Sequence, residues 1–125
     1  MKLSTIDDGG FLMVEGVPGQ RFMSRVDDVN RIVESCFDEN VRGALLYAEN
    51  LTDRFFDLSS GEAGAILQKL RNYGVRLAVV CPPGSIRFSS RFGEMLAEEQ
   101  RGSHFGVFGT RDEAREWLSR QLERR

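Results

Sequence analysis

The sequence predicts one α/β domain, in which helices pack on a mixed, mostly parallel sheet in the element order ββαβαβαβα. Its 125 residues suit a single domain spanning positions 1–125. Two short apolar runs, 44–48 and 77–81, are nearly continuous, as in strands covered on both faces. Helical patterns of roughly 10 to 15 residues alternate with the strands, which is typical of a parallel sheet between helices.

The N-terminal third is expected to hold a hairpin and a helix. Residues 2–6 and 11–15 read as strands, because the Asp7-Asp8-Gly9-Gly10 segment between them favours a turn. The first helix is predicted to begin at Ser24, which with Asp27 resembles a capping box. The turn after this helix is expected to end at Asn40 or Gly43. The buried stripe of the helix, at three- and four-residue spacing, would be Val26, Val29, Val33, Cys36 and Phe37.

The central stretch from Gly43 to Val80 is expected to organise the domain. Residues 43–47 form a buried strand, and the polar loop 48–54 follows, held in the core by Phe55 and Phe56. Ser59 or Ser60 is predicted to cap the second helix, since Ser59-x-x-Glu62 matches a capping box. Gly74 would end that helix, and residues 75–80 form the next strand. The stripe expected to face the core is Ala63, Ile66, Leu67, Leu70 and Tyr73.

The C-terminal third adds two helices and a strand. The third helix is expected over residues 89–101, and the last strand over 104–108. Thr110-x-x-Glu113 is another capping box and predicts the start of the last helix. The inward side chains of these two helices would be Phe92, Met95, Leu96, Ala114, Trp117, Leu118 and Leu122.

Composition argues against several classes of partner. The net charge is −2, without the basic patch that nucleic acid binding requires. The apolar runs are far shorter than the ~18 residues of a membrane span, and the N-terminus lacks the apolar segment of a signal peptide. We therefore expect a cytoplasmic protein that binds neither nucleic acid nor a membrane.

The reactive side chains do not form a recognisable catalytic set. Two cysteines, Cys36 and Cys81, are too few for a disulfide framework and fit a reducing compartment. His104 is the single histidine and has no acidic or cysteine neighbours at metal-ligand spacing, so we expect no metal and no cofactor. An enzyme that uses Cys81 or Glu49 is the least favoured interpretation, and we expect no enzymatic activity.

Residues 55–61, Phe-Phe-Asp-Leu-Ser-Ser-Gly, run into Gly-Ala-Ile-Leu at 64–67. This segment resembles STAS domains of the anti-sigma factor antagonist type, where an Asp-Ser-Ser-Gly step opens a helix after a buried strand. The element order is similar as well. A closer resemblance is to a bacterial family known only as a domain of unknown function, family 4180. It rests on residues 49–51, 55–58, 61, 63–64, 66–69, 72–73 and 77–78. Both resemblances imply a STAS-like fold.

The resemblance implies a regulatory role at the start of the second helix. STAS antagonists are regulated by phosphorylation of the first serine of the step, which here falls on Ser59, with Ser60 beside it. Leu58 separates Ser59 from Asp57, whereas the two are adjacent in the family. A helix cap is the structural alternative for these serines, and a phosphate at a helix N-terminus is compatible with it. We expect a non-enzymatic regulatory or protein-interaction module with an unknown protein partner, and a homodimer through the hairpin edge is conceivable.

The alternative hypothesis is a small anion or nucleotide sensor. Glu49, Asn50 and Arg54 lie in the loop at the carboxyl end of a predicted parallel strand, where ligands bind in α/β sheets. The backbone amides of Ser59, Ser60 and Gly61 could complete an anion or nucleotide site. The structural interpretation of the same residues is a solvated loop in which Arg54 pairs with a carboxylate.

Overall fold

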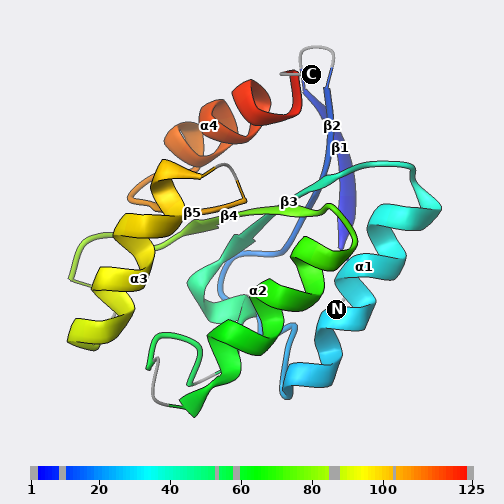
Figure 1. Cartoon of the computed structure of the whole chain (residues 1–125). Helices are drawn as coiled ribbons and strands as arrows, with labels where there is room; N and C mark the ends of the chain where they lie inside the picture. The colour runs from blue at the N-terminus through cyan, green and yellow to red at the C-terminus, as the bar shows by residue number, and fades with distance from the viewer. Residues whose placement is uncertain are drawn as a thin grey trace.

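A computed structural model of the chain describes residues 3–8, 11–52, 54–57, 60–84, 88–102 and 104–123. Its strands form one sheet in the order β1-β2-β3-β4-β5 (Figure 1), and this confirms the predicted α/β class and element order. The elements are β1 (Ser4–Asp8), β2 (Phe11–Glu15), η1 (Val26–Asp28), α1 (Val29–Asp38), β3 (Gly43–Tyr47), η2 (Ala48–Asn50), α2 (Glu62–Asn72), β4 (Arg76–Val80), α3 (Ser90–Arg101), β5 (Phe105–Phe108) and α4 (Arg111–Glu123).

The sheet is mixed, with one antiparallel edge. β1 pairs antiparallel with β2, and β2 to β5 are all parallel. Each crossover therefore moves by one strand in the same direction. Because such crossovers are right-handed, α1, α2 and α3 must lie on the same face of the sheet. Figure 1 shows α1 and α2 on one side and α4 on the other.

Side chains alternate between two cores, one on each face of the sheet. Leu46, Leu77 and Val79 point to the core beneath α1, α2 and α3. Leu45 and Ala78, one position along, contact the core beneath α4 with Trp117. Both faces are thus covered, which explains the two continuous apolar runs in β3 and β4.

Five phenylalanines join the loop after β3 to the core. Phe55 is fully buried and meets Phe56, Phe92 and Phe105 edge to face, with ring centroids 5.1, 5.9 and 5.9 Å apart. Phe88 stacks on Phe56 at 5.3 Å. The prediction that Phe55 and Phe56 anchor the loop is confirmed.

α1 and α2 end in the same way, with one residue of positive φ. These residues are Asn40 (φ 56°) and Gly74 (φ 70°). Beyond them, Val41 N–H donates to Cys36 O and Val75 N–H to Leu70 O, both at 2.9 Å. This is the pattern of a Schellman motif. It confirms Gly74 as the end of α2, and of the two residues expected to end the turn after α1, Asn40 rather than Gly43 does so.

The predicted cap of the last helix is confirmed as well, and α3 is capped by a serine. Thr110 Oγ1 accepts from Glu113 N–H at 3.2 Å. Ser89 Oγ accepts from Phe92 N–H at 3.1 Å.

The start of the chain differs from the prediction in two places. Asp7 and Asp8 are not turn residues but belong to β1, where the register sets Asp8 opposite Phe11. Gly9 and Gly10 lie outside the described residues. Strand pairing with β2 outweighs the low strand propensity of aspartate.

The predicted capping box at Ser24 is also wrong. A 3₁₀ turn precedes α1, and its cap is the Asp28 carboxylate, which accepts from the N–H groups of Ser24 (2.7 Å) and Arg25 (3.1 Å). Asp28 therefore takes the role predicted for the Asp27 carboxylate, and the box begins at Arg25, one residue after Ser24.

Two aromatic side chains that the helical pattern assigned to the core are exposed. Phe37 is 79% and Tyr73 52% exposed, whereas the other predicted members of the two stripes are at least partly buried. Phe37 is in the last turn of α1 and Tyr73 just follows α2. Both residues therefore lie where the helices end. Their spacing continues the apolar stripe, but their side chains are not packed in the core.

Replacing Phe55 by alanine should lower the free energy of unfolding by about 3–5 kcal/mol, since a buried ring is lost from a packed cluster. The matched control is Phe37→Ala, which removes an exposed ring and should change stability by less than about 0.5 kcal/mol. Urea denaturation followed by circular dichroism measures both. Similar losses in the two variants would contradict the assignment of the two rings.

Candidate functional site

The loop after β3 is built around Asn50, which is fully buried. Its Oδ1 accepts from Tyr47 N–H at 2.8 Å. Its Nδ2 donates to Val17 O at 2.8 Å and Gln20 O at 2.6 Å. Its backbone oxygen accepts from Met23 N–H at 2.8 Å. Asn50 therefore ties the segment before α1 to the end of β3, and the side chain proposed above for a ligand has a structural role.

Gly16 makes room for this arrangement. A Cβ atom at that position would overlap the Asn50 amide and approach Leu46 Cδ2 at 3.2 Å. The backbone N–H of Gly16 continues the β2–β3 pairing, donating to Leu45 O at 3.0 Å. The close approach of two backbone segments is what requires a glycine here.

The other predicted residues of the loop lie at the surface. Glu49, Arg54 and Gly61 are exposed, and Gly61 has φ 78°. Ser60 Oγ accepts from Glu62 N–H at 3.2 Å, so it satisfies an N–H group at the start of α2, although Gly61 and not Ser60 occupies the N-cap position. The same hydroxyl lies 2.9 Å from Arg54 O and 2.8 Å from Asp57 O, and it donates to one of them.

The Ser60 hydroxyl lies beside the backbone oxygen of Arg54, so the loop after β3 and the start of α2 are close together. The sensor hypothesis requires this proximity. Ser59, the predicted phosphoacceptor, lies outside the described residues. Its modification stays a prediction. A phosphate on Ser60 would break the turn that its hydroxyl closes.

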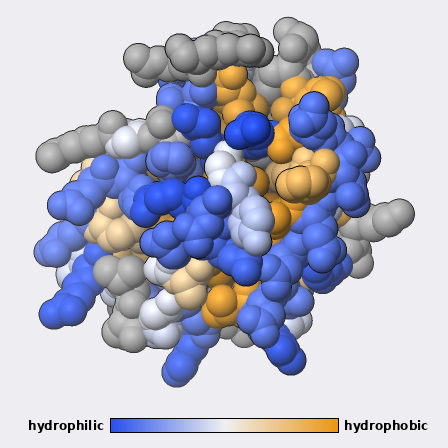
Figure 2. Space-filling model, turned by 45° about the vertical axis from the view of Figure 1, so that its right-hand side comes forward, coloured by the Kyte–Doolittle hydropathy of each residue, from blue (hydrophilic) through white to orange (hydrophobic). Residues whose placement is uncertain are grey.

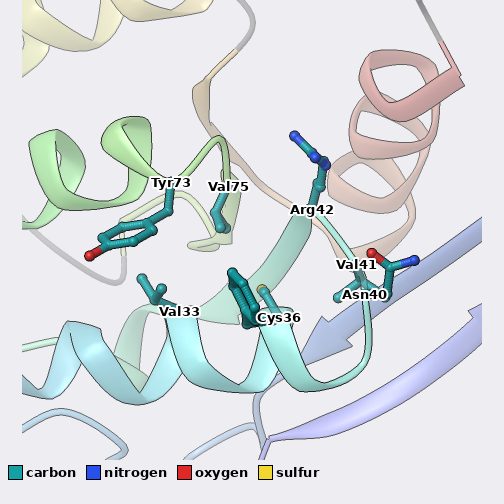
Figure 3. Close-up of a pocket in the computed structure, with 8 residues that line it drawn as sticks. Val33, Cys36, Asn40, Val41, Arg42, Tyr73 and Val75 are labelled. Atoms are coloured by element: carbon teal, nitrogen blue, oxygen red, sulfur yellow. The ribbon is translucent and has the colours of Figure 1, made fainter.

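A groove runs between the C-terminal ends of α1 and α2. Two hollows of about 180 Å³ and 340 Å³ share Val33, Phe37 and Tyr73. Figure 3 shows Val33 and Cys36 rising from α1 toward Tyr73 and Val75, which follow the end of α2. We call this the α1–α2 groove, lined by Asn30, Val33, Glu34, Cys36, Phe37, Asp38, Asn40, Val41, Arg42, Tyr73 and Val75.

The floor of the groove is apolar and buried, while its walls are exposed aromatics. Val33, Val41 and Val75 are at most 9% exposed, in contrast to Phe37 and Tyr73. On the face that carries α1, hydrophobic residues interrupt a mostly hydrophilic surface (Figure 2). Exposed apolar side chains gathered around a hollow are typical of binding surfaces.

The charges around the groove are separated. Glu34 and Asp38 line the larger hollow, and Arg42 lines the smaller one. Lys69 Nζ lies 5.7 Å from the centre of the Tyr73 ring. Burial raises the pKa of the Cys36 thiol to about 12, so it stays protonated at neutral pH and is a poor nucleophile. Apolar contact and charge pairing are what these residues can offer.

Sequence reasoning missed the groove because it counted both aromatics as core. The available signal was the end of each helix: Phe37 is three residues before Asn40, and Tyr73 directly precedes Gly74. A side chain at the end of a helix can extend past the edge of the sheet on which the rest of the apolar stripe packs.

A second polar cluster joins β2, β3 and α4. Arg111 Nε donates to Glu15 Oε2 and Nη2 to Oε1, both at 2.9 Å, and Tyr47 O–H donates to Oε2 at 2.6 Å. Burial alone would raise the pKa of Glu15, but the hydrogen bonds from Arg111 and Tyr47 and the charge of Arg111 lower it. Burial, followed by the hydrogen bond to Glu15, raises the pKa of Tyr47 to about 12.

This cluster was not predicted either, because Glu15 and Arg111 are 96 positions apart. The carboxylate accepts three hydrogen bonds, so its capacity is largely used within the chain. We assign it the role of a clamp that holds the start of α4 on the sheet.

The remaining candidates carry little chemistry. Cys81 is buried and directly follows β4. His104 precedes β5, and its Nδ1 is buried without a hydrogen-bond partner in the described part of the chain. No group of three His, Cys, Asp or Glu side chains able to hold a metal ion occurs among the residues described. Within the same residues, no helix has the length and apolar character to cross a bilayer.

Asn50→Ala should destabilise the protein by about 3 kcal/mol, because it removes a fully buried side chain that makes three hydrogen bonds to the backbone. Glu49→Ala is the control: the neighbouring side chain is exposed, and its loss should cost less than about 0.5 kcal/mol. Unfolding in urea gives both values. An Asn50→Ala protein as stable as wild type would contradict the structural role.

Glu15→Gln should lower stability by about 1–2 kcal/mol near pH 7, since charge-assisted bonds are lost and Arg111 is partly exposed. The lowered pKa means that ionised Glu15 stabilises the fold above its unfolded pKa of 4.5. That contribution disappears as pH falls through the lower folded value, so wild type and variant should converge in acid.

The free energy of unfolding, measured from neutral to acid pH, tests this convergence. Glu116→Gln serves as the control, because the Glu116–Arg120 pair is exposed and should contribute little at any pH. A constant difference between wild type and Glu15→Gln across the range would contradict the assigned linkage.

Comparison with known proteins places the chain in a family. Residues 12–118 match a family described as Domain of unknown function (DUF4180). This range begins in β2, ends in α4, and includes Asn50 and the whole α1–α2 groove. No curated protein and no solved structure matches the chain. Since the match covers most of the 125 residues, the protein is a member of the DUF4180 family.

Proposed function

We propose that this protein is a non-enzymatic regulatory module that acts by binding another protein, with the α1–α2 groove as its contact surface. One observation carries the proposal. Three large hydrophobic side chains are exposed among the described residues, and two of them, Phe37 and Tyr73, flank the same groove. Aromatic residues are enriched at protein interfaces and supply much of the binding energy.

The STAS resemblance supports a regulatory reading. The element order and the segment from Asp57 to Gly61 are similar to anti-sigma factor antagonists, in which a serine at this helix start is phosphorylated. By that resemblance Ser59 is the modified residue. α2 has 11 residues, so its start and the groove at its end are roughly 16 Å apart.

A partner lying along α2 would contact both ends of the helix. The outward face of α2 carries the exposed residues Gly64, Ala65 and Gln68. These residues are small or uncharged, so they permit a partner to approach the helix closely. A phosphate at the helix start adds negative charge to one end of that contact. The groove would then provide the binding energy, and phosphorylation of Ser59 would regulate the binding of the partner.

The test is affinity capture from the native host with tagged wild type, a Phe37→Ser/Tyr73→Ser variant and a Leu12→Ser control. Leu12 is also exposed, at 42%, but it is not a groove residue. We expect a protein that wild type and control retain and the groove variant loses, with roughly 10- to 100-fold weaker binding. Mass spectrometry of the captured bait reports the state of Ser59.

If all three baits capture the same proteins in equal amounts, the groove is not the contact surface. An unmodified Ser59 in every growth condition would remove the phosphorylation switch but leave the interaction surface standing.

A further inference from the structure

We infer that the α1–α2 groove binds the same groove of a second copy of this chain, across a two-fold axis. The inference rests on the proposed function, in that the groove is a protein-binding surface, and it names one occupant. Two-fold pairing uses the same patch on both molecules, so the patch must complement itself in shape and in charge. The groove meets both conditions.

The shape condition is met by a projecting ring beside a hollow. Phe37 is 79% exposed, and it borders the hollow of about 180 Å³ whose buried lining includes Val33, Val41 and Val75. A benzene ring fits a cavity of about 150 Å³, so the hollow is large enough for one ring, with Asn40 and Arg42 as the polar part of its lining. The Phe37 ring of one molecule can therefore enter the hollow of the other, and the symmetry repeats the contact in reverse.

The charge condition follows from which residues line each hollow. Val33, Phe37 and Tyr73 belong to both hollows and so lie in the middle of the groove. Of these two hollows, the larger one is lined by the acidic pair, Glu34 and Asp38, and the smaller one by Arg42. The acidic pair also borders a third hollow of about 390 Å³, which it shares with Arg31. A two-fold axis that passes between Phe37 and the smaller hollow places each Phe37 ring over the smaller hollow of the other molecule. The same axis brings the acidic pair of each molecule toward Arg42 of the other.

These three charges are available for such a contact. Glu34, Asp38 and Arg42 are all exposed, and none of them forms an ion pair with another residue in the part of the chain that the structure describes. Opposite charges that approach across an interface fix its register and favour the correct pairing.

The contact is small, so we expect a reversible dimer with a dissociation constant on the order of 10 µM. Sedimentation velocity over a concentration series measures it directly with the purified full chain. Phe37→Ser should weaken the dimer by about 10-fold or more, whereas Leu12→Ser should leave it unchanged. Phe37 is exposed in the monomer, so this substitution does not threaten folding.

A charge-exchange experiment tests the geometry. Arg42→Glu should abolish the dimer, since acidic side chains then face each other at both ends. Glu34→Lys/Asp38→Lys should abolish it as well, since basic side chains then meet. An equimolar mixture of these two variants restores opposite charges at both ends of the heterodimer. We expect the mixture to regain the wild-type dissociation constant within about 3-fold.

Recovery in the mixture also shows that both variants are folded. The inference is overturned if wild type remains monomeric at about 500 µM, 50-fold above the expected constant, or if the variant mixture stays monomeric while wild type forms a dimer. It is also overturned if the dimer forms and the Phe37→Ser variant dimerises equally well.

The same measurements separate this inference from the proposed function. A monomeric wild type that still captures a groove-dependent partner from its host would overturn the dimer alone. A groove-dependent dimer that captures no other protein would overturn binding to another protein and leave the dimer in place.

Discussion

The handedness of the strand connections is the constraint on which this structure depends. The five strands lie in sequence order, and each parallel crossover advances by one strand. A right-handed connection then has one choice of face, so α1 and α2 become neighbours on the same side. The α1–α2 groove is the gap that two such neighbours leave where both end. The other face of the sheet is left to α4, which follows the last strand.

The carboxyl ends of β2 and β3 are held together by buried or half-buried polar groups. Asn50 fastens the segment before α1, and Glu15 fastens the start of α4. In α/β sheets this edge commonly binds ligands, but here its best-placed polar side chains are bound within the chain. This use of Asn50 weakens the sensor hypothesis, and it leaves the surface of α1 and α2 as the more favourable place for recognition.

The groove combines a buried, packed floor with exposed aromatic walls. Its floor belongs to the main core through Val33, Val41 and Val75, so its shape is fixed by the packing of the whole face. Its walls, Phe37 and Tyr73, are free to contact another molecule. A rigid floor with exposed aromatic walls needs little reorganisation on binding, which favours affinity. The start of α2, where the proposed regulatory serine would lie, is at the far end of the same helix.

The sequence by itself determined the fold class, the element order, the stop at Gly74 and the anchoring of Phe55, and it left Asn40 and Gly43 as alternatives for the turn after α1. Each depends on local spacing or backbone preference, which the chain carries at every position. Only the tertiary structure decided that Phe37 and Tyr73 face outward, that Asn50 is buried, and that Glu15 meets Arg111. Those outcomes depend on where separate elements end relative to one another. Helical periodicity indicates the direction in which a side chain points, but not how far the sheet beneath it extends.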